Sequence, residues 1–268
     1  MSFLNVTRAP DDADNGTGDV LTAGRQSLEQ LLAEGVFGPS TGPAFFVYRL
    51  EQGSHCQTGI VAGVATADYE NATVKVHEQV RRERVGHLAR HLRVVGAQSS
   101  PIALAYAGHP LVTEAIAQTA ERSSPFLDFS DDRGLRQQIW QVTDSADIAA
   151  IDGAFDDASL YLIDGHHRAA AASADHQDFG SQNGGTHFML AALFPHEELR
   201  SFAFHRFLSA VDPVAIEAEI TARLPVRKTT DLNTVAARGE AEIALALPTD
   251  DGDDPTQWLL IDLSLIHI

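Results

Sequence analysis

The most informative stretch of the chain is residues 160–172, Leu-Tyr-Leu-Ile-Asp-Gly-His-His-Arg-Ala-Ala-Ala-Ala. Its first four residues are apolar and its last four form helix readily, so the stretch predicts a strand, a tight turn and the start of a helix. Asp164 to Arg168 fill the turn with a carboxylate, two imidazoles and a guanidinium. A strand that leads directly into a helix favours a domain that contains both kinds of element.

The turn carries an unusual arrangement of charge. The first turn of a helix exposes free N–H groups and a partial positive charge, so a cationic Arg168 there is unfavourable unless an anion lies in front of it. A phosphate group would supply that anion. A simpler interpretation makes Asp164 the N-cap of the helix and Gly165 a turn residue. That interpretation explains two of the five residues and leaves the His-His-Arg run without a reason.

Helical and strand patterns alternate irregularly along the rest of the chain. The predicted helices are 21–35, 78–95, 111–122, 145–155, 169–176 and 212–224, and the predicted strands are 44–50, 59–66, 101–106, 126–129, 137–142, 188–194 and 204–208. The first two strands predict an antiparallel hairpin, and 68–71 predicts a turn. Ser145 suits an N-cap and Pro213 a first helical position. We therefore predict an α+β fold, a mixed sheet flanked by helices, in a single domain over residues 1–262.

Composition narrows the classes of function. Lys and Arg number 19 against 37 Asp and Glu, a formal charge of -18, and this field disfavours nucleic-acid partners. Cys56 is the single cysteine, which excludes an intrachain disulfide and a cysteine-based zinc site. No signal-peptide pattern and no apolar run of membrane-spanning length is present, so we expect a cytoplasmic protein without membrane contact. The sequence does not indicate an oligomeric state.

The last six residues, 263–268, resemble the translation of an adapter used in sequencing libraries. On that interpretation the natural chain continues beyond about residue 262 and is truncated here. The alternative is a genuine terminal strand, because residues 258–263 are apolar.

Two further motifs contain residue types suited to phosphate chemistry. Lys75-Val76-His77-Glu78 brings two cationic or titratable groups next to a carboxylate, and a Glu beside cations acts well as a general base. The alternative is a solvated helix start. His205 and Arg206 lie between two phenylalanines on a predicted strand, where they would either line the same pocket or face solvent.

Metal binding is a competing use of the same residues. The adjacent His166 and His167, completed by Asp164, His77 or His205, would provide a mixed ligand set of histidines and a carboxylate. No His-x-His or His-Glu-x-x-His spacing is present. A magnesium ion that arrives with a nucleotide needs fewer ligands, and Asp164 would suffice.

At these motifs the chain resembles the family catalogued as domain of unknown function 1015. The resemblance covers roughly residues 20–225 and includes segments 47–49, 57–61, 75–78, 100–102, 139–140, 161–168 and 204–206, in the family's order. Val76 departs from the family, which often has Pro or Lys at that place. Ala169 also departs, because an aromatic ring usually follows the arginine.

The turn also resembles that of the ParB/sulfiredoxin-like superfamily, whose free serine kinases carry an upstream His-Glu element and a downstream Asp-Gly-His-His-Arg turn. The resemblance implies a ParB/sulfiredoxin-like core with insertions, in which Glu78 is the base for a substrate hydroxyl. Catalysis would involve Asp164 and His167 as well, and Asp164 would hold Mg²⁺. The phosphates of ATP or ADP would be bound by Lys75, His77, Gly165, His166, Arg168, His205 and Arg206. Sulfiredoxin chemistry is disfavoured, because it needs a cysteine at this turn.

Three functional hypotheses follow from these motifs. The first is a nucleotide-dependent phosphotransferase that acts on a small hydroxylated metabolite. The second is a non-catalytic nucleotide or phosphometabolite regulator whose partner surface is the insertion 107–157. The third is a metal-dependent hydrolase.

Overall fold

The chain folds into two compact units, residues 1–201 and 202–268, where the sequence predicts a single domain. The computed structural model describes residues 3–7, 17–38, 42–179, 187–200, 212–236, 242–247 and 257–263. No linker signal marks the division, because residues 201–212 contain neither a Gly/Ser-rich run nor a block of like charge. The predicted strand 204–208 lies outside the described residues.

The first unit is built on an eight-stranded mixed sheet, ordered β3-β7-β4-β8-β2-β1-β6-β5. The pairs β3/β7 and β4/β8 are parallel and the other neighbours are antiparallel, which confirms the predicted mixed α+β architecture. The strands are β1 (Phe45–Gln52), β2 (His55–Ala65), β3 (Val74–Lys75), β4 (Ile102–Tyr106), β5 (Leu127–Ser130), β6 (Arg136–Val142), β7 (Leu160–Asp164) and β8 (Phe188–Pro195).

The predicted hairpin of β1 and β2 is confirmed, with Gly53 at positive φ in its turn. Farther along β2, Gly59 marks a close approach to β8. A Cβ atom at this position would lie 2.2 Å from the carbonyl oxygen of Leu193 and 2.7 Å from the Phe194 ring. A side chain there would push the two strands apart, so glycine is required by packing at the centre of the sheet.

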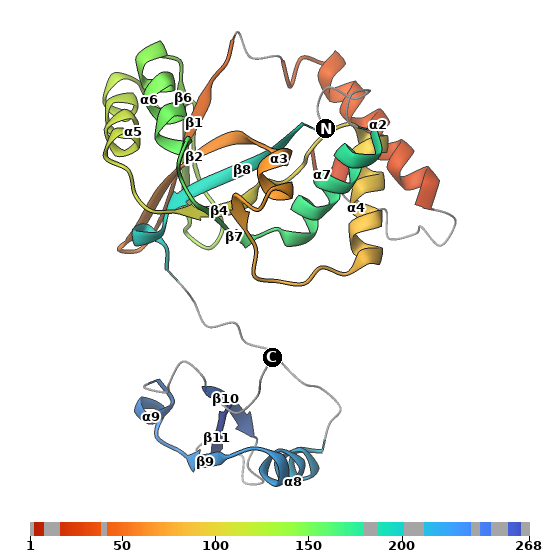
Figure 1. Cartoon of the computed structure of the whole chain (residues 1–268), viewed down its shortest axis with the longest axis vertical. Coiled ribbons are helices and arrows are strands. Elements are labelled where there is room, and N and C mark those ends of the chain that lie inside the picture. Colours follow the sequence, from red (N-terminus) through yellow and green to blue (C-terminus); the bar gives the residue numbers. More distant parts are fainter. Residues whose placement is uncertain are drawn as a thin grey trace. The chain divides into compact units, whose positions relative to one another are not determined.

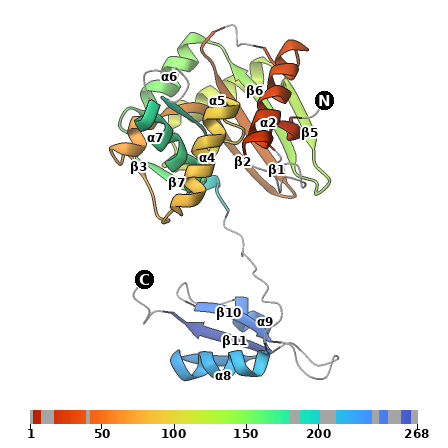
Figure 2. The same ribbon diagram turned by 90° about the vertical axis from the view of Figure 1, so that its right-hand side faces the viewer.

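The helices of this unit are α1 (Leu4–Thr7), α2 (Thr17–Ala33), α3 (Thr66–Glu70), α4 (Arg82–Val95), α5 (Pro110–Arg122), α6 (Ser145–Phe155) and α7 (His166–Phe179). Helices α4 and α7 lie side by side, with α2 against α4 (Figure 1; Figure 2). None of the described helices is long and apolar enough to cross a lipid bilayer.

Several predicted boundaries are wrong, and three of them lie close to the sequence motifs. Residues 68–71 belong mostly to helix α3 rather than to a turn, since the chain bends into one helical turn directly after β2. Helix α4 starts at Arg82, so Glu78 precedes it, at a bend in a segment that is neither strand nor helix. Helix α7 starts at His166, because its first turn closes with the Ala169 N–H donating to the Gly165 carbonyl over 2.9 Å.

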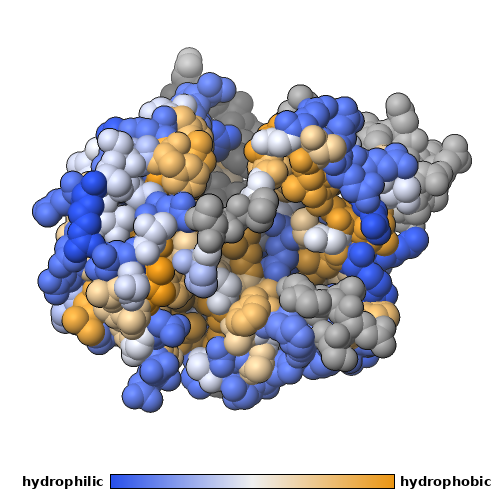
Figure 3. Space-filling model, turned by 90° about the horizontal axis from the view of Figure 1, so that it is seen from above, coloured by the Kyte–Doolittle hydropathy of each residue, from blue (hydrophilic) through white to orange (hydrophobic). Residues whose placement is uncertain are grey.

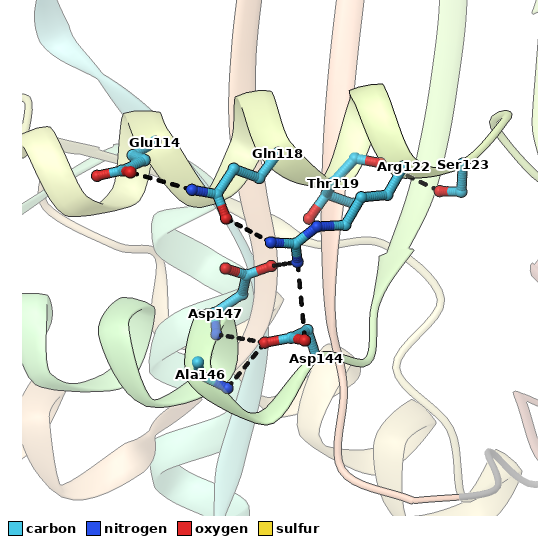
Figure 4. A network of polar contacts seen from close by, with 8 residues as sticks. All are labelled: Glu114, Gln118, Thr119, Arg122, Ser123, Asp144, Ala146 and Asp147. Atoms are coloured by element: carbon cyan, nitrogen blue, oxygen red, sulfur yellow. Dashed lines mark hydrogen bonds and ion pairs between the residues drawn. The ribbon is translucent and has the colours of Figure 1, made fainter.

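Segment 107–157, predicted to be an insertion for a partner, belongs to the sheet and its helices, because β6 pairs with β1 over seven residue pairs. A polar network joins α5 to α6 beside this strand (Figure 4). Arg122 donates to Gln118 over 2.6 Å and to the buried Asp147 over 2.7 Å. The N-cap of α6 is Asp144 and not Ser145, because its carboxylate accepts from the amides of residues 146 and 147.

The largest hydrophobic cluster of the first unit packs helix residues against the sheet. It includes β-strand residues such as Val47, Ile60, Leu104 and Leu162 and helix residues such as Ile151. Elsewhere on the molecule apolar patches interrupt the hydrophilic surface, as the view from above shows (Figure 3).

The second unit has its own sheet and core. Strands β9 (Val226–Thr229), β10 (Glu242–Leu247) and β11 (Gln257–Asp262) form an antiparallel sheet in the order β10-β11-β9. Helix α8 (Pro213–Arg223) packs on it through Ile220, and α9 spans Leu232–Ala236. Pro213 takes the first position of α8, as predicted, and Asp212, predicted to be the first residue of the helix, is its N-cap. Residues 258–262 lie in β11, the central strand, and of the six residues predicted to be an adapter only Leu263 is described.

Candidate functional site

The sheet topology brings the two principal sequence motifs together. Strands β3 and β7 are parallel neighbours, so their carboxyl ends lie at the same edge of the sheet. The segment 76–81 follows β3, and the turn at Gly165 follows β7. The β4/β7 register shifts beside this turn, where Ala103 pairs with Asp164 but Leu104 pairs with Leu162. Such irregularities re-aim side chains at the end of a strand, which here is the start of the turn.

Gly165 permits the sharp passage from β7 into α7. Its φ is +93°, in a region that side-chain-bearing residues rarely adopt. A Cβ atom there would lie 2.9 Å from Nε and Nη2 of Arg168 and 3.0 Å from Cγ2 of Ile102. The glycine therefore shapes the turn and leaves room for the arginine side chain that folds back over it.

His166 is the buried centre of the cluster. It is 4% exposed, and its Nδ1 lies 3.6 Å from Oε2 of Glu78. The His77 ring meets the His166 ring edge to face, with centroids 4.5 Å apart. Burial lowers the pKa of His166 and nearby His77 adds to the effect, while the carboxylates of Glu78 and Asp164 oppose it. Its Nε2 is buried without a hydrogen-bond partner, which is unusual for an imidazole nitrogen.

His167 contacts the segment that follows β3. Its Nε2 accepts a hydrogen bond from the backbone N–H of Arg81 over 3.1 Å. An imidazole nitrogen that accepts carries no proton, so the neutral ring has its proton on Nδ1. The contact joins the first turn of α7 to the residue that precedes α4.

Arg168 is paired with groups of its own chain. It forms an ion pair with Asp164, and its Nη1 donates to the Pro101 carbonyl over 2.8 Å. Asp164 thus gives Arg168 an anionic partner from its own chain, so the charge of Arg168 does not by itself require a phosphate at this turn. The simpler interpretation, in which Asp164 is the N-cap of α7, is also wrong, because Gly165 is the residue that precedes the helix.

A small open pocket of about 60 Å³ adjoins Arg168 between α4 and α7. Residues of both helices and of the loop before β4 line it, namely Leu88, His91, Leu92 and Ala171 on the helices and Ala97, Gln98, Ser99 and Ser100 in the loop. Its size suits a small group rather than a whole nucleotide.

Of the remaining predicted site residues, Lys75 is part of the structure as described and His205 and Arg206 are not. Lys75 lies at the end of β3, but its ammonium donates to the Ala72 carbonyl in its own turn over 2.8 Å. His205 and Arg206 lie outside the described residues. Within the described ranges no group of three or more His, Cys, Asp or Glu side chains is arranged to hold a metal ion.

Sequence reasoning missed the backbone groups of the cluster. The Arg81 N–H and the Pro101 carbonyl each bind a side chain of the first turn of α7. Backbone partners leave no residue-type signal, because every residue except proline offers the same N–H and carbonyl. Pro101 lies in one of the segments of the family resemblance, but that segment does not indicate which atom is used.

Comparison with known proteins identifies the family. The sequence model described as "Protein of unknown function (DUF1015)" matches residues 1–251, which is most of the chain. No curated protein and no solved structure gives a significant match. The chain therefore belongs to the DUF1015 family.

Proposed function

We propose that the protein is a nucleotide-dependent phosphotransferase that uses ATP or ADP to phosphorylate a hydroxyl group of a small metabolite. The observation that carries the proposal is the convergence of Glu78 on the first turn of α7, with Glu78 Oε2 3.6 Å from the buried His166 Nδ1. On this proposal the first unit has a ParB/sulfiredoxin-like core with insertions. The turn resembles that of free serine kinases of this superfamily, in which the same two elements serve one site.

The N-terminus of α7 supports the phosphate half of the proposal. The helix has 14 residues, so its first N–H groups and its dipole favour an anion. The buried, unpartnered Nε2 of His166 lies in that first turn and points independently to a missing ligand group. Arg168 is already oriented by Pro101 and Asp164, and its remaining N–H groups would bind phosphate oxygens.

Glu78 supports the proton-transfer half. Its side chain is 55% exposed, so a substrate hydroxyl has access to it. The hydroxyl oxygen forms a bond to the terminal phosphorus of the nucleotide, the bond from that phosphorus to its bridging oxygen breaks, and the hydroxyl proton passes to Glu78. Phosphoryl transfer needs positioning and charge neutralisation more than covalent chemistry from the protein, and these residues offer both.

Magnesium fits this arrangement as an ion carried by the nucleotide. Mg²⁺ keeps several waters and needs one or two carboxylates besides the phosphates. Asp164 would hold it, because its side chain is 74% exposed at the mouth of the turn. When bound, the ion neutralises charge on the phosphates. The described residues show no larger ligand cluster of the kind that the metal-dependent hydrolase hypothesis requires.

The test is consumption of ATP or ADP with Mg²⁺ against a panel of small alcohols and hydroxylated amino acids. We expect the Glu78→Gln variant to lose about 10²- to 10⁴-fold in turnover, the usual contribution of a general base. Glu83→Gln, an exposed glutamate in the first turn of α4, is the matched control and should keep full activity. Full activity of both Glu78→Gln and Arg168→Ala would refute the proposal. Nucleotide-induced thermal stabilisation without turnover would favour the regulator hypothesis.

A further inference from the structure

We infer that His167 is a positioning residue rather than a catalytic one: its neutral imidazole holds the segment 76–81 against α7 and so sets the place of Glu78. The inference deepens the proposed function and rests on it for the role of Glu78. The hydrogen bond from the Arg81 N–H to His167 Nε2, 3.1 Å long, carries it.

The segment 76–81 has little else to fix it. Strand β3, which precedes it, contains two residues and pairs with β7 through Val74 and Lys75 alone. Between β3 and α4 the backbone forms neither strand nor helix, and all six residues of the segment are exposed except Val80, which is half-buried. A segment with few buried contacts opens easily, so single contacts along it have a large effect on its position.

Two histidines of α7 contact the segment 76–81 at different points. His166 meets His77 and Glu78 from the interior, through a ring contact and a carboxylate contact at 3.6 Å. His167 binds the far end of the segment at Arg81. Strand β3 and His167 therefore fix the two ends, and Glu78 lies between them opposite His166.

The chemistry of the contact excludes His167 Nε2 from catalysis while the contact lasts. Nε2 accepts from a backbone amide, so its lone pair is engaged and cannot take a substrate proton. Arg81 is the N-cap residue of α4, and that helix end has no capping bond from the N-cap side chain. Moving Nε2 toward a ligand would leave the Arg81 amide without this partner and release the segment that carries Glu78.

A glutamine would preserve the contact. The side-chain carbonyl of glutamine reaches about as far as Nε2 and accepts the same hydrogen bond, but it cannot act as an acid or base. Leucine fills similar space and accepts nothing. His167→Gln and His167→Leu thus separate an acceptor role from a catalytic role. His87 is an exposed histidine on α4, so His87→Gln and His87→Leu are matched controls.

The experiment combines nuclear magnetic resonance with kinetics. In the wild type, the His167 ring should carry its proton on Nδ1, and the Arg81 amide should be protected from hydrogen exchange. In His167→Leu that amide should exchange about fivefold to tenfold faster, as expected for one lost hydrogen bond, and turnover should fall. In His167→Gln both protection and turnover should remain within about twofold of the wild type, as in the two His87 variants.

The outcomes are distinguishable from failure of the proposed function. A proton on His167 Nε2, or unchanged Arg81 protection in His167→Leu, would overturn the inference whether or not turnover is found. Loss of turnover in His167→Gln with Arg81 still protected would also overturn it, because it would show that the ring has a chemical role. Absence of turnover in the wild type would count against the phosphotransferase and leave the tautomer and exchange measurements to decide the contact.

Discussion

Replacing Gly165 by alanine tests whether the turn into α7 is constrained by packing as well as by backbone conformation. Two effects add at this position. A non-glycine residue at φ of +93° costs about 1–2 kcal/mol of strain. The new Cβ would also lie 2.9 Å from the Arg168 guanidinium and 3.0 Å from Ile102, so the arginine must move.

The packing term follows from the two bonds that Arg168 makes. Its hydrogen bond to the Pro101 carbonyl contributes about 1 kcal/mol, and its partly exposed ion pair with Asp164 contributes about 0–1 kcal/mol. Displacing the guanidinium would cost about 1–2 kcal/mol beyond the strain. We therefore expect Gly165→Ala to lower the free energy of unfolding by about 2–4 kcal/mol.

Gly134 supplies the matched control, because it has a φ of +76° and open space around its Cβ position. Gly134→Ala should show the strain alone, about 1–2 kcal/mol. Calorimetry of the two variants should place the melting temperature of Gly165→Ala about 2–8 °C below that of Gly134→Ala, given about 2–4 °C per kcal/mol for a unit of this size. Equal melting temperatures for the two variants would refute the claim that the Arg168 side chain is held in place over the turn.

Three further predictions test the fold and the buried histidine. Gly59→Ala should lower the free energy of unfolding in urea by about 3 kcal/mol or more, because β2 must move away from β8. Gly86→Ala, where the new Cβ meets open space in α4, should raise it by about 0.5–1 kcal/mol. Reversed signs would contradict the packing argument. Arg122→Ala should cost about 1–3 kcal/mol because the buried Asp147 loses its cation, and a double-mutant cycle with Asp147→Ala should show coupling near 1 kcal/mol rather than zero. Because the pKa of His166 is lowered in the folded protein, the unfolded chain takes up this proton first as the pH falls. The contribution of His166 to stability should therefore be full above about pH 6.5 and decrease as the pH drops toward the folded pKa. His166→Gln should lose that part of the pH dependence, and parallel stability profiles for wild type and variant would be the contrary result.

The sequence predicted the strands and helices better than their ends, and the reason is physical. Apolar alternation and helical spacing reflect burial, so β4, β8 and the β1–β2 hairpin were recognisable. The starts of α4 and α7 depend on which amides find partners in the fold. Glu78 suits a first helical turn by its charge, but α4 starts only at Arg82, and β3 and His167 hold the two ends of the segment before it.

The candidate site was predictable as a set of side chains but not as a set of contacts. The motifs around Glu78 and His166 were both identified from residue type, and the parallel pairing of β3 with β7 explains why they meet. The partners of His167 and Arg168 are backbone atoms at Arg81 and Pro101, which no residue pattern marks. The Asp164–Arg168 pair was not predicted, because residue type suggested a cap or a magnesium ligand for Asp164 and not a partner for Arg168.

Because of the Asp164–Arg168 pair, we expect Asp164→Asn to change nucleotide affinity in opposite directions with and without Mg²⁺. On the proposed function, Asp164 would compete with a phosphate for Arg168, and an exposed pair of this kind is worth at most about 1 kcal/mol. Without Mg²⁺, Asp164→Asn should therefore tighten ATP or ADP binding by up to about fivefold, since 1.4 kcal/mol is a factor of ten. With Mg²⁺, the same variant should bind more weakly, because the ion loses its carboxylate. Asp132→Asn, on the exposed turn between β5 and β6, makes the same change of charge away from the site and should alter neither affinity. Titration calorimetry in EDTA and in Mg²⁺ measures both, and an Asp164→Asn affinity that moves the same way in both buffers would show that this carboxylate does not exchange Arg168 for a metal ion.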